Sequence, residues 1–213
     1  MFIDLVLPKN NEKEFIETAE KLKIDGLCFV YSFKNREDFL KKNEKIKKLQ
    51  KKTNIRLFSG LITDSKNIIK AKKLSNLVIY TSTGNDRYAI EKSNLTIIFG
   101  LETIAARDSM HSRNSGLNQV LCKLANKNNV IIGFSFSGIL NTDGVTRSQI
   151  LGRTMQNIRL CRKYKVKTVV ASFAEKPYEM RPYHDLKSVF ICFGMHPEET
   201  KNSLENLCRC LSC

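Results

Sequence analysis

The sequence predicts an α/β fold: a TIM-barrel-like (β/α) barrel with parallel strands and outer helices, forming a single domain over residues 1–213. Short apolar runs alternate with amphipathic segments almost from end to end, which is typical of a parallel sheet covered by helices. Eight such runs fit an eight-stranded barrel. The alternative is a doubly wound open sheet. It is disfavoured because no glycine-rich phosphate loop follows the first run.

The first half of the chain is expected to form four strand–helix units. The strands are expected over residues 2–7, 26–31, 56–62 and 77–80, and the helices over residues 12–22, 36–51, 66–74 and 86–92. The first of these helices is predicted because Phe15, Ile16, Ala19 and Leu22 recur at helical spacing. Asp64 or Ser65 suits the N-cap of the third helix.

The second half continues the alternation around one long irregular segment. Strands are expected over residues 96–99, 130–135, 168–172 and 188–193, and helices over residues 117–127, 146–164 and 198–207. The apolar stripe of the helix 117–127 consists of Leu117, Val120, Leu121 and Leu124, and that of the helix 146–164 consists of Ile150, Leu151, Met155, Ile158 and Cys161. The irregular segment 100–116 is expected to be functional, as long loops in compact domains usually are.

The charge balance favours a polyanionic partner. The chain holds 36 Lys and Arg against 21 Asp and Glu, for a formal net charge of +15. Paired lysines in the helix 36–51 form a solvated face that attracts phosphates without sequence preference. Arginines are concentrated after residue 80, and the guanidinium fork can grip one phosphate or stack on a base. We therefore expect directed nucleic-acid contacts in the second part of the chain.

Localisation and thiol chemistry are expected to be those of a cytoplasmic protein. No apolar run approaches the ~18 residues that span a bilayer, and the apolar start ends at Pro8-Lys9 without the features of a secretory signal. We expect buried thiols at Cys28, Cys122, Cys161 and Cys192. The tail cysteines Cys208, Cys210 and Cys213 lack metal-ligand spacing, and the chain is expected to fray from about residue 208.

The most informative segment is the polar loop and helix start at residues 109–125. The loop carries His111 and Arg113 into the N-terminus of a helix. Free backbone N–H groups and the positive end of the helix dipole there favour an anion. In a chain this basic, we expect the anion to be a nucleic-acid phosphate.

Other basic residues are expected to extend this anion site. Five arginines fall in loops or at helix starts that follow expected strands, so a (β/α) barrel would bring them to one rim: Arg87, Arg107, Arg113, Arg147 and Arg181. The alternative is that they pair with nearby acids, namely Glu102, Asp108, Asp143 and Glu179. Helical projection also places Lys123, Arg153 and Arg159 on outward faces, where they can track a phosphate backbone or remain solvated.

Catalytic and metal-binding patterns are weak in this sequence. No two of His111, His184 and His196 have ligand spacing, so neither a metal nor another cofactor is expected. Asp4 and Asp25 lie beside strands and need partners, for which a salt bridge serves as well as catalysis. No G-x-S-x-G pattern exists, and no residue is assigned a catalytic role.

The segments 113–125 (RNSGLNQVLCKLA) and 132–137 (IGFSFS) resemble the central signature of the archaeal and eukaryotic ribonuclease P protein component 3 family. The start Phe2-Ile3-Asp4-Leu5, the Asp25-Gly26 pair and the length agree, so the resemblance spans nearly the whole chain. It implies a TIM-barrel-like protein that does not cleave RNA itself. It also implies partners: the catalytic RNA that removes the 5′ leader of precursor tRNA, the protein component 2 and the other protein subunits. Arg113, Asn114 and Asn118 are the signature residues that the resemblance marks for RNA or partner contact.

Two other functions remain open from the sequence. The expected barrel distantly resembles the polymerase-and-histidinol-phosphatase phosphoesterases, whose first metal ligands are two histidines flanking one residue in strand one. The matching place here reads Leu5-Val6-Leu7, which argues against a metal-dependent phosphoesterase. The third candidate is a docking module that binds protein alone.

Overall fold

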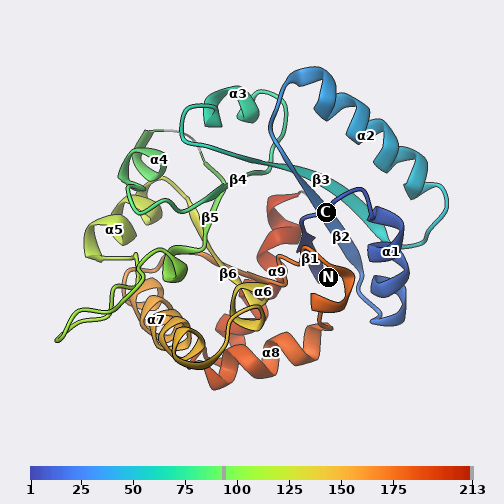
Figure 1. Ribbon diagram of the computed structural model, residues 1–213. Helices are drawn as coiled ribbons and strands as arrows, with labels where there is room; N and C mark the ends of the chain where they lie inside the picture. The colour runs from blue at the N-terminus through green and yellow to red at the C-terminus, as the bar shows by residue number, and fades with distance from the viewer. Residues whose placement is uncertain (93–94, 212–213) are drawn as a thin grey trace.

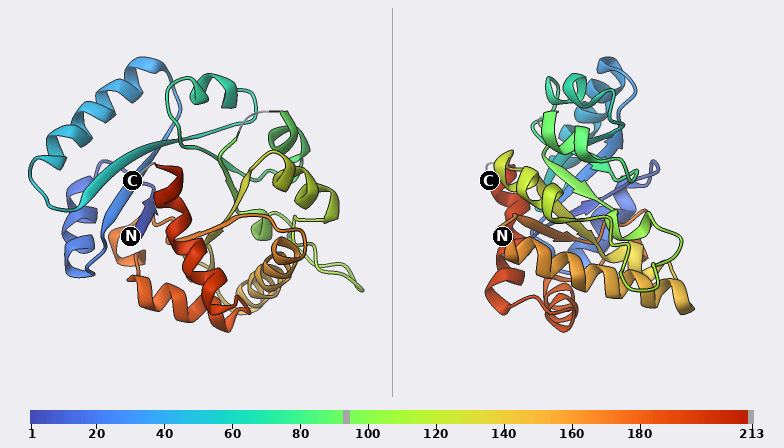
Figure 2. Two further views of the ribbon diagram at one scale, coloured as in Figure 1. Left: turned by 180° about the vertical axis from the view of Figure 1, so that it is seen from behind. Right: turned by 90° about the vertical axis from the view of Figure 1, so that its left-hand side faces the viewer.

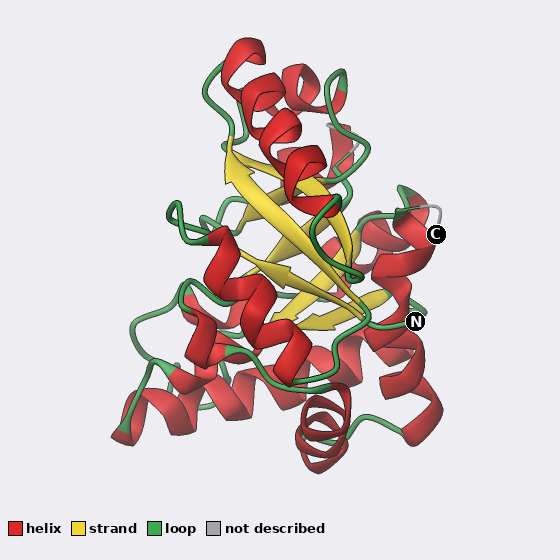
Figure 3. Ribbon diagram, turned by 90° about the vertical axis from the view of Figure 1, so that its right-hand side faces the viewer, coloured by secondary structure: helices red, strands yellow, loops and turns green. Residues whose placement is uncertain are grey.

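The computed structural model describes residues 1–92 and 95–211. Seven parallel strands follow one another around a barrel in chain order, and helices surround it (Figure 1). The strands are β1 (Ile3–Val6), β2 (Gly26–Ser32), β3 (Arg56–Thr63), β4 (Val78–Thr81), β5 (Ile97–Phe99), β6 (Ile131–Ser135) and β7 (Thr168–Ala171). The predicted TIM-barrel-like fold is confirmed, with the strands enclosed by helices and loops (Figure 3).

The helices fall where the amphipathic segments predict them, apart from additions after β6 and β7. They are α1 (Glu12–Lys21), α2 (Arg36–Gln50), α3 (Ile68–Lys72), α4 (Arg87–Lys92), α5 (Gln119–Lys127), α6 (Phe136–Leu140), α7 (Gly144–Lys163), α8 (Tyr183–Cys192) and α9 (Pro197–Cys210). Asn35 caps α2 by accepting from the backbone N–H of Asp38 at 2.8 Å. The N-cap position of α3 is Asn67 rather than Asp64 or Ser65, and Asp64 instead accepts from the N–H of Asn67 at 3.0 Å.

The eighth expected strand is wrong, because residues 183–192 form helix α8. Leu186 and Phe190 are buried one helical turn apart, whereas a short apolar run alone does not distinguish a buried strand from a helix. The barrel is closed without it. Val6 of β1 pairs in parallel with Ala174 beyond β7, and the N–H of Leu7 donates to the carbonyl of Ala174 at 2.8 Å.

Asp4 of β1 also contacts the residue that follows β7. Its carboxylate accepts from the N–H of Ser172 at 2.7 Å and from the Ser172 hydroxyl at 2.6 Å. Of the two explanations left open for Asp4, the salt bridge is not formed within the described chain, since the partner is a serine 168 residues away. Burial raises the pKa of Asp4 to about 6, against the opposing effect of these hydrogen bonds. Asp25 accepts from the N–H of Phe2 at 2.8 Å and forms no ion pair with a residue that the structure describes.

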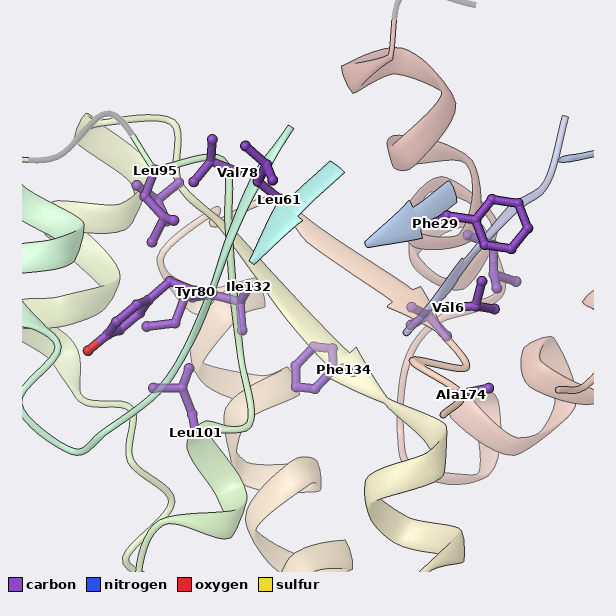
Figure 4. Packing of buried hydrophobic residues seen from close by; sticks show 14 of the residues in the cluster. Val6, Phe29, Leu61, Val78, Tyr80, Leu95, Leu101, Ile132, Phe134 and Ala174 are labelled. Carbon is purple, nitrogen blue, oxygen red and sulfur yellow. The ribbon is translucent and has the colours of Figure 1, made fainter. Parts of the chain in front are cut away.

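The core has two layers, as alternation along the strands requires. One layer lies between sheet and helices and includes Val6, Phe29, Tyr80 and Phe134 (Figure 4). The other fills the barrel interior with Ile3, Leu5, Val30, Ile79, Ile97 and Val169. Helix α9 lies across the rear opening of the barrel (Figure 2, left), and its end packs against this inner layer through Leu207, Cys208, Cys210 and Leu211.

The cysteines are distributed between the core and the surface. Cys208 and Cys210 lie in the last turn of α9, in the part of the tail where fraying is expected from the sequence, and Cys213 lies outside the described residues. Cys192 is exposed on α8 because its predicted strand does not form, while Cys28, Cys122 and Cys161 are buried as predicted.

Candidate RNA-binding surface

The five loop arginines all follow the C-terminal ends of neighbouring strands. Arg87 begins α4 after β4, and Arg107 and Arg113 lie in the long connection after β5. Arg147 is in the first turn of α7 after β6, and Arg181 lies between β7 and α8. Because the strands are parallel, these connections share one end of the barrel. Four of the side chains are exposed, and that of Arg181 is half-buried.

Most of these arginines keep their charge uncompensated. Among the described residues only Arg87 of the five forms an ion pair, with Glu91 at 3.3 Å. Arg113 and Arg147 donate to the backbone carbonyls of Gly152 and Leu140, at 3.3 and 3.2 Å. Arg181 donates to the carbonyls of Tyr178 and Met180 at 2.8 and 2.7 Å. Within the part of the chain that the structure describes, none of the five forms an ion pair with Glu102, Asp108, Asp143 or Glu179, although the charge of Arg113 helps to lower the pKa of Asp108.

The connection after β5 projects from the barrel as a narrow loop (Figure 1). Its tip is a tight turn in which the N–H of Ser109 donates to the carbonyl of Ser112 at 2.9 Å. Met110 in this turn is 92% exposed, and His111 beside it is exposed too. The tip therefore reaches into solvent, where a large partner can contact it.

Asn114 closes the base of this loop. Its side-chain amide donates to the carbonyl of Arg107 at 2.8 Å, and its backbone N–H donates to the Asp108 carboxylate at 2.9 Å. Burial would raise the pKa of Asp108, but the hydrogen bonds from Arg153 and Asn114 outweigh that effect and hold the pKa below its usual value. The carboxylate is thus ionised at neutral pH and serves as the acceptor around which the loop turns.

Arg153 supplies the other half of that anchor, so the prediction that it faces outward is wrong. Its side chain is 2% exposed and forms a 2.7 Å ion pair from Nε to Asp108. Its Nη1 donates to the carbonyls of Glu102 at 3.1 Å and Ala105 at 2.6 Å. The loop covers this face of α7, and a helical projection of α7 alone cannot show that another segment lies over it. Because it is buried, Arg153 does not face RNA; its role is to position the loop after β5.

Residues 113–116 of the central signature hold the loop against the barrel and α7. Arg113 lies over Gly152, where an added Cβ would come within 3.0 Å of its Nε. Ser115 is buried, and its carbonyl accepts from the Asn157 side chain at 2.9 Å. Gly116 has φ +74°, and a Cβ there would lie 2.3 Å from the backbone oxygen of Leu101. Only glycine fits that approach.

Asn118 is the N-cap of α5, accepting from the N–H of Leu121 at 2.9 Å. Lys123 is exposed on this helix, as predicted. The predicted stripe is only partly core, because Val120 is 53% exposed while Leu121 and Leu124 are half-buried. Cys122 and Ala125 are the buried residues of α5, so the buried face is rotated from the prediction. On α7, Arg159 is exposed as predicted.

The barrel mouth at this same end holds a cavity of about 760 Å³. Its lining includes Tyr31, Phe99, Glu102, Ser135 and Asn141, together with Lys9 and Lys34. Glu102 is 2% exposed, and burial raises its pKa to about 7. Among the described residues no three His, Cys, Asp or Glu side chains gather as metal ligands. His111, His184 and His196 lie on separate elements: the loop tip, α8 and the N-cap of α9.

The basic residues of the loop were predicted from the sequence, but the residues that hold the loop in place were not. Asp108, Ser115 and Asn157 hold the loop, yet each looks like an ordinary polar residue in the sequence. Gly152 was the available signal, because glycine inside a long helix costs about 1 kcal/mol and calls for a packing reason.

Over the described ranges, none of the helices is both long enough and apolar enough to cross a membrane.

Comparison with known proteins identifies relatives of this chain. The family described as RNase P subunit p30 matches residues 1–211. Ribonuclease P protein component 3 of Methanocaldococcus jannaschii is 26% identical over 204 residues, covering 91% of this chain and 83% of that protein. Its Thermococcus kodakarensis counterpart is 31% identical over 146 residues, covering 68% of this chain and 64% of that relative, slightly under two thirds of its length.

A solved structure has the same fold. A chain in the cryo-EM structure of archaeal ribonuclease P with mature tRNA superposes with a TM-score of 0.80 at 21% identity, covering 99% of this chain and 90% of that one. The family match extends over both halves of the barrel and includes the signature loop. This chain therefore belongs to the RNase P subunit p30 family.

Proposed function

We propose that this chain is a non-catalytic, RNA-binding protein subunit of ribonuclease P, the ribonucleoprotein that removes the 5′ leader from precursor tRNA. The observation that carries the proposal is the family match over residues 1–211. The proposed partners are the catalytic RNA, the protein component 2 and the other protein subunits, with precursor tRNA contacted weakly or indirectly. The proposed compartment is the cytoplasm, where the free thiols predicted from the sequence suit a reducing environment.

The contact surface proposed for RNA is the strand-end rim with its projecting loop. Its members are Arg87, Arg107, His111, Arg113, Asn114, Asn118, Lys123, Arg147, Arg159 and Arg181. Support comes from Arg107, Arg113, Arg147 and Arg181, which form no ion pair within the described chain, since guanidinium groups without carboxylate partners remain available to phosphates. Asn114 and Asn118 already use polar atoms to hold the loop and cap α5, so their part in RNA contact is to present the neighbouring arginine and helix N-terminus.

The proposed mechanism is electrostatic. The net charge of +15 offsets the repulsion between RNA helices that must pack together, and between the catalytic RNA and precursor tRNA. The loop adds direction to this diffuse attraction because Arg153 and Asp108 fix its base. A flexible loop would lose part of its binding free energy to ordering, whereas an anchored loop has less freedom to lose.

A salt titration tests this proposal. Binding of the full chain to ribonuclease P RNA is expected to weaken steeply with salt, with a log–log slope of about −3 or steeper if ~4 phosphates are contacted. An Arg107→Gln/Arg113→Gln/Arg147→Gln variant is expected to have a shallower slope by about 2 or more. Lys187→Gln on α8 removes one charge outside this surface and should change the slope by less than about 0.9, the value of one phosphate contact. A flat titration for the wild-type chain would overturn the electrostatic mechanism.

The metal-dependent phosphoesterase is the second candidate and is not favoured. The described chain offers no cluster of metal-ligating side chains, and Leu5 and Val6 at the end of β1 are buried apolar residues. Hydrolysis of a generic phosphoester by the isolated protein with added Mn²⁺ or Zn²⁺, lost on changing Asp4 or His111, would support that function. Capture of another protein without any RNA affinity would instead support a pure docking module.

A further inference from the structure

A second polar cavity opens at the opposite end of the barrel, where the strands begin. It measures about 460 Å³. Its walls come from residues that precede four consecutive strands and from the end of α9: Asn76, Thr96, Asn129 and Lys167, with Lys72 of α3, Ile131 of β6, and Asn206, Arg209 and Cys210 of α9. Helix α9 lies over this end of the barrel (Figure 2, left). The arginine loops described above are therefore not part of it.

The cavity collects positive charge without a counter-charge. Lys72, Lys167 and Arg209 line it, and none of the described lining residues is a carboxylate. None of these three cations forms an ion pair within the described part of the chain, whereas Arg153 and Lys45 pair with Asp108 and Glu12. The helix dipole accounts for single cations at the ends of α3 and α9. It does not account for their meeting Lys167, which precedes a strand.

Lys72 is the innermost of the three and is half-buried. Its Nζ donates to the carbonyl of Asn76 at 2.8 Å and to the Thr96 hydroxyl at 3.1 Å, which leaves one of its three N–H donors for a ligand. Burial lowers its pKa. Burial raises the pKa of the Cys210 thiol, and the charges of Lys167 and Lys72, which line the same cavity, both oppose that rise. A bound anion would offset the cost of desolvating Lys72.

Arg209 is held in place by amide side chains rather than by an acid. Its Nη1 donates to Oδ1 of Asn206 at 3.3 Å and its Nη2 to Oδ1 of Asn202 at 3.1 Å. Asn206 is in turn fixed by donating from its Nδ2 to the carbonyl of Thr168 at 2.8 Å. The guanidinium therefore keeps donors for another group in a defined position.

We propose that this cavity, lined by Lys72, Lys167 and Arg209, binds a phosphate group. A tetrahedral oxyanion accepts several hydrogen bonds at once, and guanidinium and ammonium groups are the donors that proteins use for it. The volume lies in the range of small-molecule sites and exceeds that of one phosphate, so it leaves space for an attached nucleoside. The phosphate can belong to a free nucleotide or to an RNA chain. The inference does not depend on the proposed role of the arginine loops.

The test is an NMR titration of the full-length ¹⁵N-labelled protein with three probes: inorganic phosphate, a 5′-phosphorylated RNA trinucleotide, and the same trinucleotide without the phosphate. Phosphate is expected to shift the amide signals of Asn76, Thr96 and Asn129 saturably. A response to both RNA probes assigns the site to internal RNA phosphates, and a response to inorganic phosphate and the 5′-phosphorylated probe alone assigns it to a terminal or free phosphate.

Variants decide whether the cavity is responsible. Lys72→Gln, Lys167→Gln and Arg209→Gln are each expected to weaken phosphate binding about tenfold, the equivalent of one charge-assisted hydrogen bond. Lys70→Gln on α3 and Lys201→Gln on α9 remove the same charge outside the cavity and are expected to change affinity less than twofold. Lys167 is exposed, so its variant remains informative if the loss of Lys72 impairs folding. No saturable shift with any probe, or equal losses in cavity and control variants, would overturn the proposal.

Discussion

Replacing Arg153 with methionine tests whether a buried ion pair positions the projecting loop after β5. The side chain loses a 2.7 Å ion pair with Asp108 and hydrogen bonds to the carbonyls of Glu102 and Ala105. Breaking a buried pair costs about 3–5 kcal/mol. Asp108 is 22% exposed and keeps its bond from the N–H of Asn114, so the lower end, about 3 kcal/mol, applies. In a chain of 213 residues that corresponds to a fall in Tm of roughly 6–12 °C.

The assay combines thermal unfolding with limited trypsin digestion. Trypsin is expected to cut the Arg153→Met variant faster than the wild type at Arg107 and Arg113, because the loop base is released while the barrel stays folded. Arg159→Met on the exposed face of the same helix is the control and should change stability by no more than about 0.5 kcal/mol. A Tm within 2 °C of the wild type, together with unchanged cleavage at both arginines, would refute the anchoring role.

Two further changes follow from the same geometry. Gly116→Ala is expected to lower the free energy of unfolding by about 3 kcal/mol, because φ is +74° and the new Cβ meets the Leu101 oxygen. Gly144→Ala, with φ +45° and open space around it, should lower it by about 1 kcal/mol. Equal losses for the two variants in urea unfolding would contradict this reasoning. Glu102→Gln concerns a carboxyl whose pKa burial raises from 4.5 to about 7. The folded state therefore binds the extra proton, and wild-type stability falls as pH rises from 4.5 to 7, by about 3 kcal/mol. The variant should gain that much relative to the wild type between pH 4 and pH 8 in urea unfolding, and a pH-independent difference would count against it.

The strand–helix alternation was readable from the sequence because each unit carries its own period. Seven of eight expected strands form, and the lost one lies where Leu186 and Phe190 are buried on one side of a helix. An apolar run of that length satisfies either structure, so only the surrounding packing decides. The barrel was predicted, but the contacts that join its first and last strands were not, since they bring Asp4 to Ser172 across 168 residues.

The candidate site was predictable in its location and less so in its parts. Parallel topology alone brings the loop arginines to one end of the barrel. Arg153 and Arg159 project to one polar face of α7, yet only Arg159 reaches solvent. The difference arises because the connection after β5 folds back over α7, and one helix's sequence carries no information about that cover.

The most direct test of the RNA-binding role is reconstituted cleavage of precursor tRNA by the catalytic RNA with component 2 and this chain. The wild-type chain is expected to raise cleavage over RNA with component 2 alone, and to cleave nothing in the absence of the RNA. The Arg107→Gln/Arg113→Gln/Arg147→Gln variant should lose most of that gain while remaining folded, because the hydrogen bonds it removes, to the carbonyls of Gly152 and Leu140, come from exposed side chains. Full activity of the triple variant, or cleavage by the protein without RNA, would contradict the account.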